Sequence, residues 1–434
     1  MKKLDVHFTR GGLADEPLLA DLLVGQLAQQ GRSVYFEYNP DFLKTGLNLS
    51  PFRLPFQDGV YTHSDSQFGP LPGLFDDSLP DGWGRLLMDR HFAALGLNPE
   101  SLSPLDRLSW LGTGTMGALT CHPPSDREEP PDAVFNLHDL ARQSELVLSG
   151  DAQDVLPPLL RAGGSPGGER PKVLVGVRRN QLISGERDLP KGFEHWIVKF
   201  SGQLDHADAG MLEYAYMHMA EAAGLVVPPV RLFKAAGQKG RAEHFFGVQR
   251  FDRQGNRRFH VHTFGNLIQS NFRIPSCDYA QLLQTARVLT RHHGDVLAAF
   301  RQMVFNILTH NRDDHVKNFA FLFDDVNLQW RMSPPYDLSW SAGPGGEHTM
   351  TIAGEGKSPT MGDIQTLAQQ ADISHRELTE IFEQVRAAIS RWPQWADQAG
   401  VTRRRAKAIA DTFPKLQGKS LSRTVVAQRQ KNRY

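Results

Sequence analysis

The stretch HNRDDHVKNFAFLF, from His310 to Phe323, joins a strongly apolar helical pattern to a predicted β-hairpin. The helical pattern repeats at 3.6-residue spacing through Val296, Phe300, Met303, Val304, Ile307 and Leu308. Two apolar runs, 319–323 and 328–332, follow with a polar Asp-Asp-Val-Asn turn between them. The polar residues of the stretch are therefore predicted to lie on a loop between a helix and a hairpin.

Two polar residues of this loop, Asp313 and Asn318, stand five positions apart. In phosphotransfer enzymes an aspartate orients the attacking hydroxyl, and an asparagine at this spacing binds magnesium. The predicted hairpin leads into SPPYDLSW, 333–340, and brings Asp337 back beside the loop, where a carboxylate is suited to bridging magnesium to phosphates. Taken alone, the Asn-Arg-Asp-Asp segment fits a charged turn equally well, and Asp337 alone fits an ordinary Pro-Tyr-Asp turn better. Together they predict a catalytic Asp313 with Asn318 and Asp337 as metal ligands.

Lys199 ends the apolar strand pattern HWIVK, and Glu213 lies on the next predicted helix, near 211–223. Most strand lysines are surface charges. A lysine and a helix glutamate in this order can form the ion pair that holds ATP phosphates in kinases. We therefore expect Lys199 to contact phosphate and Glu213 to pair with it.

Two further segments suit nucleotide binding. The loop GGSPGGERPK, 163–172, has four glycines but matches neither GxxxxGK[ST] nor GxGxxG, so a flexible connector is an equal alternative. The segment GVQRFD, 247–252, leaves a predicted strand and enters the next part of the chain. There Gln249, Arg250 and Phe251 would form a hinge that offers backbone groups to adenine, although an ordinary strand end fits as well.

Bulk properties narrow the class of protein. Lysine plus arginine and aspartate plus glutamate number 48 each, so net charge indicates no partner. The two cysteines, Cys121 and Cys277, form no CxxC or Cys/His cluster, which argues against a disulfide framework and a structural zinc site. No segment approaches the roughly 20 apolar residues of a membrane span. We expect a cytoplasmic protein without a membrane partner.

The order of the patterns predicts an α+β protein with three parts. Residues 1–125 read as a small α+β unit with a strand at 33–38 and a helix near 82–95, and a proline-rich charged linker, 123–132, follows. Residues 133–252 carry strand candidates 173–177, 195–200 and 245–251, and residues 253–434 are mainly helical from about 278 onward. The prediction is a sheet-based lobe followed by a helical lobe, with an extra N-terminal subdomain.

Taken together, these motifs resemble the HipA toxin kinases of type II toxin-antitoxin systems. The resemblance rests on GGSPGGERPK, HWIVKF, VQRFDR, NRDDHVKNF and PPYDLSW in that order, and on FEYNPDFL, FDDSLPDGWGR and DRLSWLGTGTMGALT nearer the N-terminus. It implies a two-lobed kinase fold, ATP and Mg²⁺ as cofactors, and phosphorylation of a protein serine. One position departs from the family, because Gln249 stands where glutamate is expected.

The resemblance also implies roles for individual residues. Asp313 would be the catalytic aspartate, Asn318 and Asp337 the magnesium ligands, and Lys199 the phosphate-contacting lysine. The residues implied to border the nucleotide are Gly167, Gly168, Lys172, His315, Lys317 and Tyr336. Ser165 matches the autophosphorylation serine, whose modification ejects the glycine-rich loop and inactivates such toxins. The implied partners are a HipB-like DNA-binding antitoxin, through which alone the protein would meet DNA, and an aminoacyl-tRNA synthetase as target.

Two alternatives stay open on the sequence. A corepressor that acts with a DNA-binding antitoxin is favoured by the basic stretch from Thr402 to Tyr434, although such runs are more often solvated helix faces and tails. A small-molecule phosphotransferase shares the Asp-x4-Asn pattern. Such an enzyme has no reason to place Ser165 between two glycine pairs.

Overall fold

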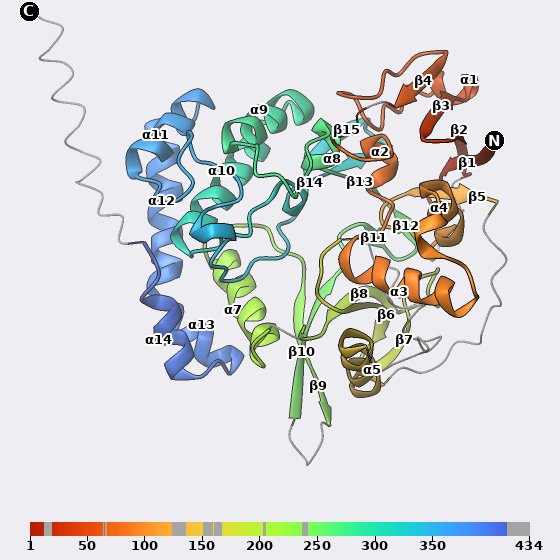
Figure 1. Cartoon of the computed structure of the whole chain (residues 1–434). Helices are drawn as coiled ribbons and strands as arrows, with labels where there is room; N and C mark the ends of the chain where they lie inside the picture. The colour runs from red at the N-terminus through yellow and green to blue at the C-terminus, as the bar shows by residue number, and fades with distance from the viewer. Residues whose placement is uncertain are drawn as a thin grey trace, which may run out of the picture. The chain divides into compact units, whose positions relative to one another are not determined.

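The structure is a computed structural model that describes residues 1–12, 20–63, 65, 67–123, 136–150, 159, 167–202, 205–236 and 242–414 (Figure 1). It divides into two compact units. The first comprises residues 1–214, 228–274 and 316–336, and the second comprises 215–227, 275–315 and 337–434. Helix α7 (Ala209–Ala222) begins in the first unit and ends in the second.

The first unit opens with an antiparallel five-stranded sheet in the order β4-β3-β2-β1-β5. Its strands are β1 (Lys2–Phe8), β2 (Leu22–Gln30), β3 (Ser33–Tyr38), β4 (Val60–His63) and β5 (Leu119–His122). Alternate residues of β1 and β3 are buried, as period-two patterning requires, and the predicted strand at 33–38 is confirmed. The associated helices are α1 (Pro40–Leu43), α2 (Gly73–Asp76), α3 (Gly82–Ala94), the 3₁₀ turn η1 (Pro99–Ser101) and α4 (Pro104–Leu111).

A second antiparallel sheet of the first unit has the order β7-β6-β8-β10-β9. Its strands are β6 (Lys172–Arg178), β7 (Gln181–Ser184), β8 (Glu194–Lys199), β9 (Val230–Ala236) and β10 (Ala242–Gln249). The predicted strands at 173–177 and 195–200 are confirmed. The strand predicted through Phe251 ends at Gln249 instead: the Arg250 N–H still bonds in register to the His195 carbonyl (2.9 Å), and a turn follows at Phe251 and Asp252.

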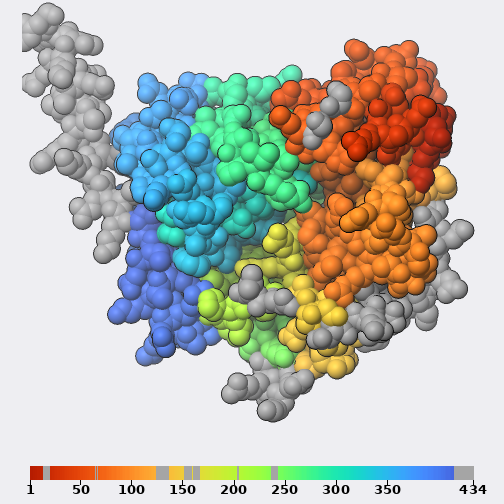
Figure 2. Space-filling model, viewed as in Figure 1, coloured from red at the N-terminus to blue at the C-terminus, as the bar shows by residue number. Residues whose placement is uncertain are grey.

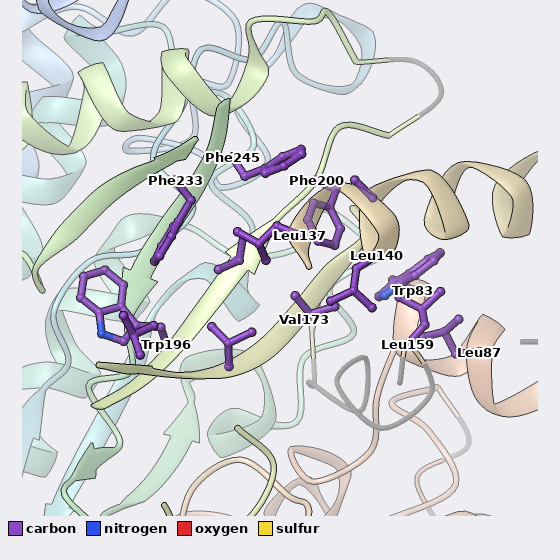
Figure 3. Close-up of a cluster of buried hydrophobic side chains, with 14 of the residues drawn as sticks. Trp83, Leu87, Leu137, Leu140, Leu159, Val173, Trp196, Phe200, Phe233 and Phe245 are labelled. Carbon is purple, nitrogen blue, oxygen red and sulfur yellow. The ribbon is translucent and has the colours of Figure 1, made fainter. Parts of the chain in front are cut away.

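One hydrophobic core joins this second sheet to two helices (Figure 3). Trp83 and Leu87 come from α3, and Leu137 and Leu140 from α5 (Leu137–Ser149). They pack with Val173, Trp196, Phe200, Phe233 and Phe245 of the sheet region. In the space-filling view the orange surface of the α3 region adjoins the yellow surface of the chain that follows the glycine-rich loop (Figure 2). The N-terminal part of the chain therefore shares its core with the second sheet.

A three-stranded antiparallel sheet completes the first unit in the order β13-β14-β15. Its strands are β13 (His260–Thr263), β14 (Ala320–Asp324) and β15 (Gln329–Met332), so the predicted hairpin is confirmed. Shorter elements of this region are β11 (Arg253–Gln254), β12 (Arg257–Arg258), α8 (Phe264–Ile268) and the 3₁₀ turn η3 (Val316–Asn318).

The second unit is mainly helical, as predicted. Its further elements are α9 (Tyr279–Thr290), α10 (His293–Leu308), η4 (Pro344–Gly346), α11 (Met361–Gln370), α12 (His375–Ser390), α13 (Trp392–Ala399) and α14 (Arg403–Ala410). Capping boxes begin α9, α11 and α12 at Asp278, Thr360 and Ser374. The apolar face predicted between Val296 and Leu308 is buried in α10.

Some sequence predictions lie outside the described residues: the linker from Pro124 onward, Ser165 with Gly163 and Gly164, and the basic tail after Pro414. The mixed α and β content is confirmed. The division into residues 1–125, 133–252 and 253–434 and the two-lobed arrangement stay predictions.

Candidate active site

Two adjacent aspartates follow α10 in the second unit, and their environments differ. Asp314 is buried, and its carboxylate accepts hydrogen bonds from the Tyr279 hydroxyl (2.8 Å), His348 Nδ1 (2.7 Å) and the Thr349 N–H (2.8 Å). Asp313 is exposed. Burial, followed by the negative charge of Asp314, raises the pKa of Tyr279 well above its usual value, so this phenol stays protonated and donates. Asp314 thus fixes the loop, and Asp313 is the aspartate that solvent reaches.

The segment that carries Asp337 returns to this loop within the second unit. Asn311 and Ser341 form a parallel bridge, the Ser341 N–H donates to the His310 carbonyl (3.1 Å), and the His310 ring stacks on Trp340 with centroids 5.8 Å apart. Asp337 has a φ of 54°, a left-handed conformation that is uncommon outside glycine. The chain thus returns to the loop at Trp340 and Ser341, and the position of Asp337 beside Asp313 stays a prediction.

The first unit holds the other end of the predicted catalytic loop, the turn η3. Asn318 is buried there, and the carbonyl of the next residue, Phe319, accepts a hydrogen bond from the Phe264 N–H (2.7 Å). Lys317 Nζ donates to Asp76 Oδ2 (3.1 Å), and the Tyr336 hydroxyl donates to the Lys317 carbonyl (2.6 Å). Burial lowers the pKa of Lys317, but the neighbouring carboxylates outweigh burial and raise the pKa.

Lys199 and Glu213 form the predicted ion pair in the first unit. Lys199 Nζ lies 2.6 Å from Glu213 Oε1, and the two side chains are only 10% and 3% exposed. Lys199 Nζ also lies 5.6 Å from the centre of the Phe246 ring. A lysine with only 10% of its side chain exposed requires such a partner, which excludes the alternative of a surface strand lysine.

Arg170, just beyond the glycine-rich loop, is a residue that the sequence analysis missed. Its guanidinium contacts Asp205 Oδ2 (3.0 Å) and Glu213 Oε2 (3.6 Å), so Glu213 faces two cations. The only sequence signal was its place in GGERPK, between the glycines and Lys172.

The end of the glycine-rich loop is tied to β6. Gly167 and Gly168 have φ of 79° and 84°, conformations that favour glycine. The buried Lys172 ammonium donates to the Gly167 carbonyl. A Cβ on Gly168 would lie 2.6 Å from Lys172 Nζ. The predicted nucleotide-bordering residues Gly167, Gly168 and Lys172 therefore form one compact turn.

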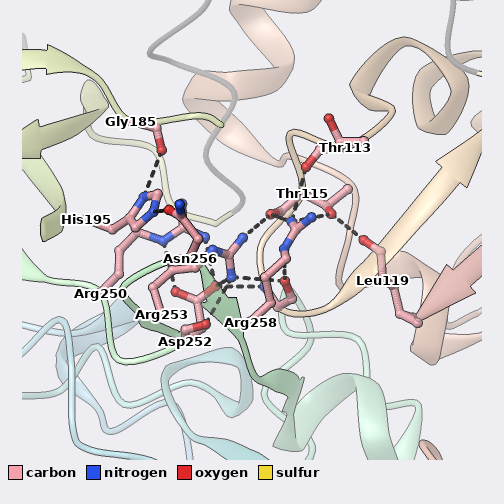
Figure 4. A network of polar contacts seen from close by, with 11 residues as sticks. Thr113, Thr115, Leu119, Gly185, His195, Arg250, Asp252, Arg253, Asn256 and Arg258 are labelled. Atoms are coloured by element: carbon pink, nitrogen blue, oxygen red, sulfur yellow. Dashed lines mark hydrogen bonds and ion pairs between the residues drawn. The ribbon is translucent and has the colours of Figure 1, made fainter. Parts of the chain in front are cut away.

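The predicted hinge is held by a buried polar network (Figure 4). Arg250 donates two hydrogen bonds to Asp252 (2.9 and 2.7 Å), and Asp252 also accepts from Arg253 (2.6 Å) and from the Gly117 N–H (2.8 Å). Arg258 donates to the carbonyls of Thr113 and Thr115 and belongs to the same network. Burial raises the pKa of Asp252, but Arg250 and Arg253 outweigh burial and hold the pKa well below its usual range.

This network changes what the hinge residues can offer. The Arg250 side chain and N–H are both engaged within the protein, and the Gln249 N–H, expected to meet adenine, donates to the Pro229 carbonyl (2.9 Å). The Phe251 ring instead stacks on Tyr336, with centroids 5.7 Å apart. Phe251 and Tyr336 thus pair with one another, while the Arg250 side chain and the Gln249 N–H bond within the protein.

A Ser–His–Asp arrangement in the first unit has the connectivity of a hydrolase triad. Ser50 Oγ lies 3.0 Å from His262 Nε2, and His262 Nδ1 lies 2.6 Å from Asp77 Oδ2. Ser50 and His262 are 1% and 0% exposed, so the hydroxyl cannot reach a substrate. The three residues are a structural network.

Within the described residues, no group of three or more His, Cys, Asp and Glu side chains gathers as a metal site. The predicted pair of Asn318 and Asp337 offers an amide and a carboxylate oxygen, the donor type that magnesium prefers. No helix in the described part of the chain is long and apolar enough to span a membrane.

The paired lysine and glutamate, the glycine turn and the Asp-x4-Asn loop are the parts of a kinase-like phosphotransfer protein. Residues 164–411 match the HipA-like C-terminal domain, and residues 18–122 match the HipA N-terminal domain. The chain belongs to the HipA family.

Individual relatives agree with this family. Two proteins of Sinorhizobium fredii are similar in sequence: one named "Putative kinase Y4mE" (28% identity over 85% of this chain and 89% of that protein) and one named "Putative kinase Y4dM" (26% identity over 71% and 72%). Among solved structures, HipA of Shewanella oneidensis MR-1, in a complex with HipB and operator DNA, covers 94% of both chains with a TM-score of 0.67 and 18% identity. The last comparison shows a shared fold.

Proposed function

We propose that this protein is an ATP-dependent serine/threonine protein kinase of the toxin type. The observation that carries the proposal is the Lys199–Glu213 ion pair, at 2.6 Å and little exposed, between α7 and β8 of the sheet that the glycine turn enters. Such a pair orients the lysine toward ATP phosphates in kinases. The sequence relatives named as kinases support the same reading.

The predicted site residues other than Arg250, which is engaged with Asp252, have roles in this proposal. Asp313 would orient the serine hydroxyl and accept its proton, and Asn318 and Asp337 would hold magnesium. Bound magnesium supplies neutralisation of the phosphate charge. The residues that would border ATP are Gly167, Gly168, Lys172, Gln249, Phe251, His315, Lys317 and Tyr336. Phe251 and Tyr336, which stack on one another, suit the base rather than the phosphates.

The biological setting is proposed from the family. HipA of Shewanella is bound to HipB and operator DNA in its solved complex, and we propose a HipB-like antitoxin for this protein as well. The target would be an aminoacyl-tRNA synthetase, so that its phosphorylation stops translation and causes growth arrest or persistence. Autophosphorylation of Ser165 would end the activity, because a phosphate of about −1.5 to −2 charge repels the ATP phosphates.

The test is incubation of the purified protein with γ-labelled ATP, magnesium and cell lysate, followed by identification of the labelled protein. The proposal expects label on serine of a protein substrate that depends on magnesium. Label that appears only on small molecules would support the alternative phosphotransferase instead. No transfer to any acceptor, with ATP binding absent, would contradict the proposal.

A further inference from the structure

One short segment of the N-terminal part of the chain, Asp76–Trp83, contacts two separate parts of the predicted nucleotide site. It runs from the end of α2 to the start of α3 in the first unit. Its partners are Lys317 in the turn η3 on one side, and Gly168 and Lys172 at the glycine turn on the other. Each of these contacts joins the N-terminal part of the chain to a part that is predicted to bind nucleotide.

Two carboxylates of the segment face Lys317. Lys317 Nζ lies 3.1 Å from Asp76 Oδ2 and 3.9 Å from Asp81 Oδ2, and the three side chains are between 15% and 20% exposed. Lys317 Nζ also lies 5.0 Å from the centre of the Phe272 ring. Two carboxylates and an aromatic ring therefore lie close to the ammonium.

Asp81 occupies the N-cap position of α3, where an aspartate ordinarily accepts a hydrogen bond from the first helical turn. It makes no such capping bond. Its Oδ1 is buried and has no hydrogen-bond partner within the described part of the chain. This carboxylate therefore makes no capping bond, and among the described residues it forms an ion pair with Lys317.

The next two residues reach the glycine turn. Gly82 has a φ of 40°, and a Cβ there would lie 2.6 Å from the Gly168 carbonyl oxygen, so only glycine permits this approach. The Trp83 N–H donates to the Gly168 carbonyl (3.2 Å), and its indole Nε1–H donates to the Lys172 carbonyl (3.1 Å). Trp83 is 1% exposed and belongs to the core that α3 shares with the second sheet.

Asp77 anchors the same segment to Thr263 and to helix α8. Its carboxylate accepts from the N–H and the hydroxyl of Thr263 (2.8 and 2.7 Å) and from Asn266 Nδ2 (2.8 Å). Thr263 caps α8, and the first residue of α8, Phe264, donates to the Phe319 carbonyl that follows η3. Asp76–Trp83 is therefore braced against the element that supports Lys317.

We propose that Asp76, Asp81 and Trp83 are positioning residues of the nucleotide site, which hold Lys317 and the glycine turn in one arrangement. Nucleotide binding would then depend on the N-terminal part of the chain. This inference rests on the proposed function for the role of the two loops. Whether the segment Asp76–Trp83 couples the glycine turn to the turn η3 can be measured without nucleotide.

The experiment compares full-length wild type with Asp76→Asn/Asp81→Asn, with Trp83→Phe and with the control Asp58→Asn. Asp58 lies in the same part of the chain and is exposed. The control variant also replaces a carboxylate by an amide, but at a position away from Lys317. Two quantities are measured: hydrogen exchange of peptides covering 167–173 and 316–319 without nucleotide, and the Kd for Mg-ATP. The melting temperature identifies any variant that fails to fold.

We expect the double variant to exchange faster in the 316–319 peptide, and Trp83→Phe to exchange faster in the 167–173 peptide. Both should raise the Kd for Mg-ATP about tenfold, because small displacements of binding groups cost large factors. Asp58→Asn should match wild type. In a Lys317→Met background, the two Asp→Asn changes should add less than a twofold further loss, since their effect acts through Lys317.

Unchanged exchange in both peptides would overturn the proposal. Tighter Mg-ATP binding in the double variant would also overturn it, because the carboxylates would then compete with phosphate for Lys317. Fully additive losses in the Lys317→Met background would show a general structural role instead. If wild type itself binds no Mg-ATP, the proposed function fails, while the exchange measurements still decide whether the segment couples the two loops.

Discussion

Replacing Asp314 by Asn changes one oxygen to an NH₂ group inside a fully buried cluster. The carboxylate accepts three hydrogen bonds, two at Oδ2 from Tyr279 and His348 and one at Oδ1 from the Thr349 N–H. An amide of the same shape has a single acceptor oxygen. In either orientation its NH₂ therefore faces at least one donor.

The cost follows from the number of bonds lost. A hydrogen bond to a charged group contributes about 1.5–3 kcal/mol, and one or two of the three bonds are lost in Asp314→Asn. We expect the free energy of unfolding to fall by about 2–4 kcal/mol. That corresponds to a melting temperature lower by roughly 5–12 °C for a unit of this size.

The neighbouring residue provides a matched control. Asp313 is exposed, so Asp313→Asn should change the free energy of unfolding by less than about 0.5 kcal/mol. It should abolish phosphotransfer, because the group that orients the hydroxyl is lost. Urea unfolding and labelled-ATP transfer measure the two effects. A wild-type melting temperature for Asp314→Asn, or an equal loss of stability in both variants, would refute the assignment of the two aspartates.

Three further predictions concern the metal, the loop serine and pH. Asp337→Ala should weaken Mg-ATP binding measured by calorimetry, since it removes a charge from the proposed metal site, and unchanged affinity would show that the carboxylate points elsewhere. Mass spectrometry should find phosphate on Ser165 after incubation with Mg-ATP. Ser165→Asp should bind ATP poorly, and Ser165→Ala should escape self-inactivation. An unmodified Ser165 in active enzyme would exclude this switch. Burial, followed by the neighbouring His262, lowers the pKa of His260 to about 3 in the folded protein. Between about pH 6.5 and pH 3 this imidazole is therefore protonated in the unfolded chain but neutral in the folded protein. The free energy of unfolding should therefore fall as pH falls from about 6.5 toward 3, by up to about 1.4 kcal/mol per pH unit from this residue. His260→Gln should flatten the slope of this free energy, measured by urea unfolding, against pH. An unaltered slope would contradict a neutral buried His260 ring.

Periodicity predicted the regular elements well where one face is buried. The alternation at 33–38 and the apolar face of α10 both reflect burial that a single strand or helix already encodes. The end of β10 was misplaced by two residues, because the chain turns at Phe251 and Asp252, where the Asp252 carboxylate binds Arg250 and Arg253, and the apolar pattern does not show this turn.

The site was predictable only in part for the same reason. Lys199 and Glu213 are 14 residues apart, and their order along a strand and a helix indicated the pair. Lys317 and Asp76 are 241 positions apart, and no local pattern joins them. Likewise, sequence cannot decide which of two adjacent aspartates is buried, since that depends on Tyr279 and His348 from other elements.

Transfer of the γ-phosphate of ATP to protein, measured side by side for wild type and Asp313→Asn, tests the central claim most directly. The two proteins should have the same melting temperature and a similar Kd for Mg-ATP. We predict magnesium-dependent label on a protein serine with wild type and none with Asp313→Asn. Equal labelling by the two proteins would contradict the assignment of Asp313, and absence of labelling and of Mg-ATP binding in wild type would contradict the kinase function itself.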